Sequence, residues 1–153
     1  MLFWITSQSP LIAKSFFGDL GMRLAHYPTM WDNGRVNLLF VEMVGFTEDL
    51  PDYFPTDEHY QKLQTFLMKN HQAGDVLQGT AGLRKVRWPD ARRGKGKRGG
   101  LRILYLHIPE VSKIYILDVY DKDEADDLSA EQRKKLSLVV ELIRAEELKR
   151  KGS

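Results

Sequence analysis

Apolar runs and period-two alternation predict four short strands in this chain. Within the second strand, alternate positions place Lys85 and Arg87 on one face and Arg84 on the other. The third and fourth strands flank a short turn from Pro109 to Lys113, which favours an antiparallel hairpin. The predicted strands cover residues 38–41, 83–88, 101–108 and 114–120.

Helical periodicity and capping residues predict three helices. Thr47 is expected to cap a short helix that ends near Pro51, and Thr56 to cap a second helix. Ser129 with Gln132 has the spacing of a capping box at the start of the third. The two longer helices are expected to end near residues 70 and 149, and their buried stripes are Tyr60, Leu63, Phe66 and Leu67, and Leu136, Val139, Val140 and Ile143.

The order of these elements from Asn37 is β-α-α-β-β-β-α, which predicts an α+β fold. We expect a small antiparallel β-sheet with helices packed on one face, and basic residues lining the exposed other face. The length of 153 residues fits one domain, which we assign to residues 36–150. Residues 1–35 form an N-terminal extension of uncertain status, and Val36 is a candidate alternative start, since bacteria also initiate at valine codons.

Composition excludes several classes of site. The chain has no cysteine, which excludes disulfides, thiolate zinc sites and cysteine nucleophiles. Its four histidines lack the close spacing of metal ligands, and we expect no metal and no cofactor. No apolar run reaches the roughly 18 residues that span a bilayer, and no cation precedes Lys14 as in a secretory signal. We therefore expect a cytoplasmic protein that does not associate with a membrane.

Charge is segregated along the chain. Nine cations and a single anion, Asp90, lie between Arg84 and Arg102, whereas residues 121–131 hold six anions and one cation, Lys122. Such segregation in a chain of near-neutral net charge indicates a basic surface for a polyanion. The loop from 89 to 100 is expected to be too polar and too rich in glycine to pack.

Three interpretations of this basic stretch compete. It is a solvated connection, or it binds nucleic acid without cutting it, with Trp88, Tyr105 or Tyr120 stacking on bases. In the third interpretation it cleaves RNA, whose 2′-hydroxyl is its own nucleophile. The protein then has only to hold the phosphate, stabilise transition-state charge and move protons, which arginine and lysine can do without a metal. His107 is a candidate general base or a core histidine.

Each candidate residue also has a structural interpretation. Lys85 and Arg87 suit a solvent-facing strand edge as well as a phosphate site. Arg102 suits an ion pair with the acidic loop, and Lys122 suits a surface salt bridge. Tyr120 suits packing at the rim of the sheet.

Three motifs, in order, resemble the RelE/HigB toxins of bacterial type II toxin–antitoxin modules. They are Gly82 to Trp88, Arg93 to Tyr105 and Ile114 to Ser129, with an upstream match over Asp57 to Gly79. The resemblance implies a compact RelE-like fold and a metal-independent endoribonuclease that cuts mRNA at the ribosomal A site and so inhibits translation. It also implies a cognate antitoxin, often of the helix-turn-helix type, as the inhibitory partner.

The resemblance assigns roles by motif. Lys85 and Arg87 correspond to the basic pair that grips the scissile phosphate and helps to move protons. Arg102 corresponds to the arginine that stabilises transition-state charge, and Lys122 to the last cation of the site, with Tyr120 beside it. The residues expected to contact RNA backbone are Arg84, Lys95, Lys97 and Arg98.

One departure from the family pattern leaves part of the chemistry open. The RelE branch has a tyrosine in its C-terminal helix, but no residue after Tyr120 is aromatic here. This points to the HigB-like branch and leaves the general acid and base unassigned. The alternatives are a non-catalytic RNA-binding relative and a domain whose basic face serves only the antitoxin.

Overall fold

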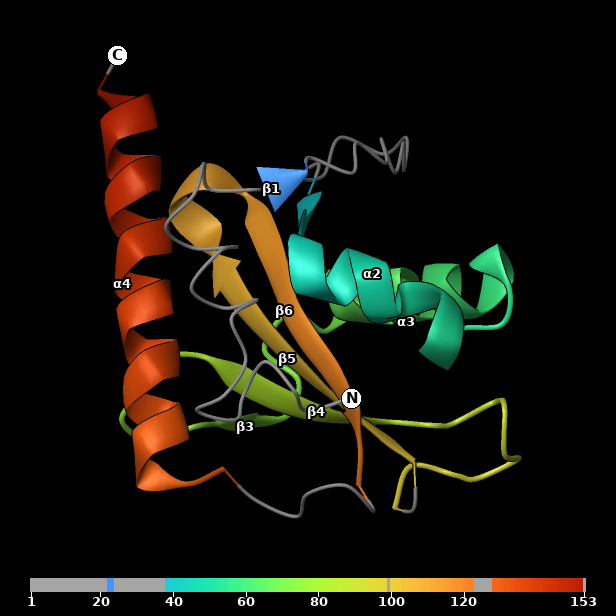
Figure 1. Ribbon diagram of the computed structural model, residues 1–153. Coiled ribbons are helices and arrows are strands. Elements are labelled where there is room, and N and C mark those ends of the chain that lie inside the picture. The colour runs from blue at the N-terminus through green and yellow to red at the C-terminus, as the bar shows by residue number, and fades with distance from the viewer. Residues whose placement is uncertain (1–21, 24–37, 99, 123–127, 153) are drawn as a thin grey trace.

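Six strands form one mixed sheet in the order β1-β2-β6-β5-β4-β3 (Figure 1). The computed structural model describes residues 22–23, 38–98, 100–122 and 128–152. The strands are β1 (Met22–Arg23), β2 (Leu39–Met43), β3 (Asp75–Val76), β4 (Arg84–Trp88), β5 (Leu101–Ile108) and β6 (Lys113–Asp121). The helices are α2 (Val44–Tyr53), α3 (Asp57–Lys69), the 3-10 turn η2 (Pro109–Val111) and α4 (Ala130–Lys151).

The α+β class and the predicted order of the main elements are confirmed. All neighbouring strands pair antiparallel except β2 and β6, which are parallel. Two short strands were not predicted. β3 lies in the glycine-containing loop before β4, and β1 lies within the N-terminal extension, where Met22 pairs with Met43 at the edge of the sheet.

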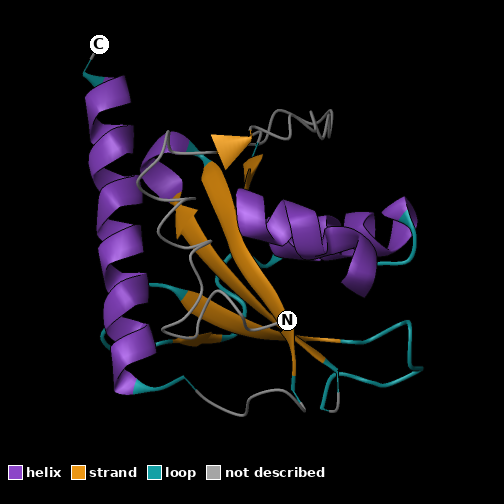
Figure 2. Ribbon diagram, in the orientation of Figure 1, coloured by secondary structure: helices purple, strands orange, loops and turns teal. Residues whose placement is uncertain are grey.

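Helices cover both faces of the sheet, so the prediction of one covered and one exposed face is wrong. Figure 2 shows α4 along one face and α2 and α3 on the other. We call these the α4 face and the α3 face. The physical reason lies in β5, where consecutive residues from Leu101 to Leu106 are all buried. A strand whose side chains are buried in both directions needs a cover on each face.

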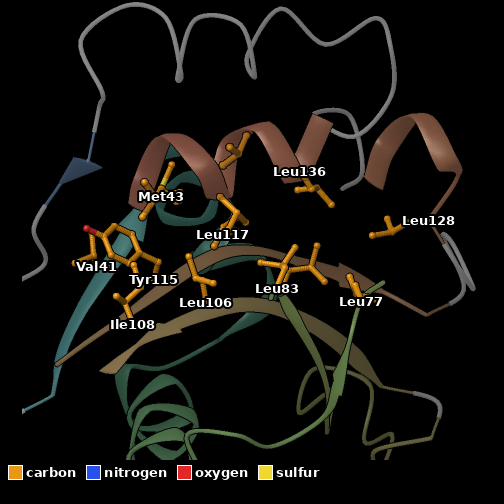
Figure 3. Packing of buried hydrophobic residues seen from close by; sticks show 14 of the residues in the cluster. Val41, Met43, Leu77, Leu83, Leu106, Ile108, Tyr115, Leu117, Leu128 and Leu136 are labelled. Atoms are coloured by element: carbon orange, nitrogen blue, oxygen red, sulfur yellow. The ribbon is translucent and has the colours of Figure 1, made fainter. Parts of the chain in front are cut away.

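The α4 face is closed by the apolar stripe that helical periodicity predicted. Its four residues, Leu136, Val139, Val140 and Ile143, all belong to the cluster that packs on the sheet. Figure 3 shows labelled members of this cluster, among them Leu106 and Leu117 of the sheet, lying beneath α4. The capping box of Ser129 and Gln132 is also present.

No helix in the described parts of the chain combines the length and the apolar character needed to cross a bilayer.

The C-terminal half of α4 is fastened to β6 by a buried carboxylate. Glu147 is 4% exposed and accepts hydrogen bonds from the Lys113 ammonium at 2.8 and 2.9 Å and from the Tyr115 hydroxyl. Burial alone would raise the pKa of Glu147, but these two hydrogen bonds outweigh burial and lower it. The site therefore stays ionised and paired at neutral pH.

The two helices on the α3 face differ in how well the sequence predicted them. Thr56 caps α3 as expected, accepting a hydrogen bond from the His59 backbone. The prediction for Thr47 is wrong: α2 begins at Val44, and the Thr47 hydroxyl donates back to the Met43 carbonyl at 3.3 Å. A threonine that bonds backwards within the first turn cannot serve as the cap. The helix includes Pro51 and ends at Tyr53, which agrees with the expected end near Pro51.

A charged substitution on α4 tests whether the predicted face of this helix packs in the core. Val140 is fully buried, so Val140→Asp puts an unpaired carboxylate between α4 and the sheet. We expect loss of folding, or a loss of more than about 4 kcal/mol in the free energy of unfolding, measured by urea denaturation. Leu138→Asp on the same helix, where the leucine is 55% exposed, is the control and should unfold near the wild-type midpoint. A Val140→Asp protein with a wild-type midpoint would contradict this packing.

Candidate functional site

The register of three strands brings predicted site residues into one row. Arg87 of β4 pairs with Arg102 of β5, which pairs in turn with Tyr120 of β6. The neighbouring row is formed by Lys85, Leu104 and Asp118. Directly paired residues point to the same face of a sheet, and neighbouring strands lie about 4.8 Å apart. Both rows lie on the α4 face, because Leu104 and Tyr120 belong to the cluster beneath α4.

A β-bulge in the pairing of β5 with β6 lies directly beside the row of Lys85, Leu104 and Asp118. The register shifts between Leu104 and Tyr105, so that Leu104 pairs with Asp118 whereas Tyr105 pairs with Ile116. The extra residue, Leu117, lies in the α4-face cluster. Bulges bend and twist a sheet locally and are frequent beside functional sites. The charged residues of the site lie on one side of this bulge, and the buried Lys113–Glu147 pair lies on the other.

The site deepens from the β4 edge towards β6. Arg87 is exposed and Lys85 half-buried, whereas Arg102 is 6% exposed and Tyr120 is fully buried. Asp118 is a fully buried carboxylate in the neighbouring row. Of the three cations, Arg87 and Lys85 are thus the more accessible to an anion from solvent and Arg102 is the least. Guanidinium groups suit phosphate because they form paired, charge-assisted hydrogen bonds.

Lys122 lies at the same end of the sheet as Arg102 and Tyr120. It directly follows β6, its backbone N–H donates to the Gly100 carbonyl at 3.2 Å, and its side chain is half-buried. Lys122 thus lies two residues beyond the row of Arg102 and Tyr120. The alternative ion pair between Arg102 and the acidic loop involves residues 123–127, which lie outside the described residues.

Arg102 binds backbone carbonyls of Leu101, at the start of β5, and of the loop that precedes it. Its Nη1 donates to the Leu101 carbonyl at 3.2 Å and to the Lys97 carbonyl at 3.4 Å, and its Nη2 to the Arg98 carbonyl at 3.4 Å. These distances are at the long end for hydrogen bonds. An anionic phosphate oxygen is a better acceptor than a carbonyl, so it can compete for this guanidinium.

The loop from 89 to 100 is not the unpacked connection that its composition predicted. Asp90 is fully buried and accepts hydrogen bonds from the Arg92 backbone N–H, from Nε and Nη2 of Arg92 and from Nε of Arg93. Arg93 also donates to Asp121 of β6 at 2.6 Å. Burial alone would raise the pKa of Asp90, but the two arginines outweigh burial and lower it from 3.8 to about 2. Pairing of the buried Asp90 with two more exposed arginines therefore orders the loop.

Close backbone packing completes the loop. The Asp90 and Lys95 backbones exchange hydrogen bonds, and a Cβ on Gly100 would lie 2.2 Å from the Trp88 carbonyl. Only glycine fits at that position. The side chains of Lys95, Lys97 and Arg98 are exposed on this ordered loop. Figure 1 shows the loop extending past the sheet on the side of α2 and α3, away from α4.

Two candidate residues lie on the α3 face, away from the rows described above. Arg84 of β4 pairs with Tyr105, and its Nη1 donates to the carbonyls of Gln72 at 2.8 Å and Gly74 at 3.2 Å. His107 lies on the α3 face too, with its ring centroid 4.6 Å from that of His71. Burial and the neighbouring His71 lower the pKa of His107. The structure therefore does not bring Arg84 or His107 to Lys85, Arg87 and Arg102.

Two acidic groups, Asp118 and Asp90, also shape this end of the sheet, although neither is one of the candidate site residues. Asp118 interrupts an otherwise apolar strand, which is a signal of a buried polar position. Asp90 pairs with the nearby Arg92 and Arg93, but the network also includes Asp121, which is distant in sequence. Comparison with models of known protein families finds no match for this chain.

The Asp90 network predicts a specific loss of stability in acid. Because folding lowers the pKa of Asp90 from 3.8 to about 2, its contribution is complete above pH 3.8 and is lost as the pH falls towards 2. We expect Asp90→Asn to lower the free energy of unfolding by about 2 kcal/mol near neutral pH. The deficit should shrink between about pH 4 and pH 2 in denaturant titrations. Glu141→Gln on exposed α4 surface is the control, and an Asp90→Asn deficit independent of pH would argue against the network.

Proposed function

We propose that this chain is the toxin of a bacterial type II toxin–antitoxin module and a metal-independent endoribonuclease that cuts mRNA. The observation that carries the proposal is the convergence of Lys85, Arg87 and Arg102 on one face of the sheet, in neighbouring register positions. Lys122 follows at the same end. The resemblance to RelE/HigB toxins, traced through three motifs in order, assigns the same cations to an RNA phosphate.

The proposed reaction uses the nucleophile that RNA carries. The 2′-oxygen bonds to phosphorus while the bond from phosphorus to the 5′-oxygen breaks. One proton leaves the 2′-hydroxyl and another reaches the departing 5′-oxygen. Arg87 and Lys85, at the open edge, hold the phosphate in line for this attack. Arg102, deeper in the site, stabilises the additional negative charge of the transition state.

Tyr120 takes a supporting part in this proposal. It is fully buried in the register position next to Arg102, so it does not reach a phosphodiester in this conformation. We assign it to holding Arg102 in place, which leaves Lys85 and Lys122 as candidates for proton transfer.

The partners in the proposal follow from the resemblance. They are mRNA presented in the ribosomal A site and a cognate antitoxin, often a helix-turn-helix protein, with the cytoplasm as the compartment. One observation favours a second candidate, a non-catalytic RNA-binding or antitoxin-binding relative. The Arg102 guanidinium already has carbonyl acceptors, and a site in which these bonds persist would bind RNA without cutting it.

Growth arrest tests the proposal. Induced expression of residues 36–153, and of the full chain, should stop growth, and Lys85→Ala with Arg87→Ala and Arg102→Ala should abolish that effect. The matched control removes three exposed cations from α4 instead: Lys134→Ala, Lys149→Ala and Lys151→Ala. The control should remain as toxic as wild type, because it carries the same loss of charge away from the site.

Mapping the 5′ ends of cellular mRNA separates the two candidates. The endonuclease predicts new ends within coding sequence after induction, and these ends should be missing in the site variant. Growth arrest without new ends would favour the binding relative. Equal toxicity of the site variant and wild type would mean that these three cations are not the site.

A further inference from the structure

Two aromatic rings and a lysine gather on the α3 face beside the end of β4. The rings of Phe66 on α3 and Trp88 on β4 lie 5.3 Å apart between centroids, at an angle of 52°. The Lys97 ammonium lies over the Phe66 ring, 5.5 Å from its centroid. Helical periodicity placed Phe66 in the buried stripe of α3, but it is only half-buried, as is Trp88.

This cluster lies across an open strand edge from the cationic rows. β3 pairs with β4 only at Arg84 and Lys85. Among the described residues, Val86 to Trp88 therefore have no strand beside them on that side. Arg87 points to the α4 face and Trp88 to the α3 face, although their Cα atoms are adjacent and about 3.8 Å apart.

The loop after β4 connects the same two faces. Its carbonyls at Lys97 and Arg98 accept hydrogen bonds from Arg102, which lies on the α4 face. The side chain of Lys97 nevertheless reaches Phe66 on the α3 face. A strand of RNA that passes over this edge thus meets cations on one face and aromatic rings on the other.

We propose that Trp88, Phe66 and Lys97 form a base-binding subsite for single-stranded RNA, next to the phosphate site of Arg87 and Arg102. This rests on the proposed function, because it needs RNA at the phosphate site. An unpaired base stacks on the exposed part of the Trp88 and Phe66 rings, and the Lys97 ammonium pairs with the phosphate of that nucleotide. The subsite takes any unpaired base, since every base has a face that can stack.

Tryptophan fluorescence tests this subsite in the full chain. The chain has three tryptophans, so Trp4→Phe with Trp31→Phe leaves Trp88 as the only reporter. The probes are a short 2′-O-methyl oligouridine, which cannot be cleaved, and an abasic backbone of the same length. The oligouridine should quench Trp88 and the abasic backbone should not. Quenching by both probes, or by neither while both bind, would overturn the subsite.

The affinity of subsite variants for the two probes is the second test of the subsite. Phe66→Leu or Trp88→Leu should weaken binding of a labelled oligouridine on the order of tenfold, with little change for the abasic backbone. Lys97→Met should weaken both probes, whereas Lys149→Met, on exposed α4 surface, should weaken neither. If both probes bind alike and Arg87→Ala still abolishes binding, the subsite is wrong and the phosphate site stands. If the unsubstituted protein binds neither probe and its expression does not arrest growth, both proposals fail.

Discussion

The cross-strand register of β4, β5 and β6 is the constraint on which the rest of the site depends. Register decides which side chains share a face, and a shift by one residue would turn each of them over. Here it aligns Arg87 with Arg102 and Tyr120 in one row and Lys85 with Leu104 and Asp118 in the next. Three cations that are separated along the chain thereby lie on one surface.

Packing keeps that register in place and limits where charges can gather. The apolar residues of β5 and β6 point alternately to α4 and to α2 with α3, so both faces are committed to a core. A shift in the register of β5 and β6 would move apolar side chains out of both core clusters at once. Buried charged groups on the α4 face lie on both sides of the bulge, with Arg102 and Asp118 on one side and the Lys113–Glu147 pair on the other. Further charge lies at the open edge of β4. The same arrangement leaves Arg87 on one side of this edge and Trp88 on the other.

The sequence predicted the local features of this fold well. The capping box at Ser129, the cap at Thr56 and the common face of Lys85 and Arg87 are confirmed, because each depends on residues close together in the chain. The covering of both faces could be anticipated from β5 only by noting that Leu101 to Leu106 lack a clean polar alternation. Runs of this kind indicate burial on both sides.

Long-range features escaped prediction. The buried Asp90 orders the basic loop by pairing with arginines that also pair with Asp121. No local sequence pattern predicts that Asp121 belongs to this network. Arg84 was counted with the basic loop by charge, although its alternation with Lys85 already placed it on the other face. The bulge at Leu104 and Tyr105 is likewise invisible in the sequence, because a mismatch between two strands exists only after they pair.

The most direct measurement of the central claim is a nuclear magnetic resonance titration of labelled protein with a 2′-O-methyl RNA trinucleotide that lacks a free nucleophile. We expect the largest side-chain shifts at the guanidinium groups of Arg87 and Arg102 and at the ammonium of Lys85, with little change on the outer surface of α4. Shifts spread over the cations of α4, with Arg87 and Arg102 unaffected, would contradict a phosphate site built by the register of these strands.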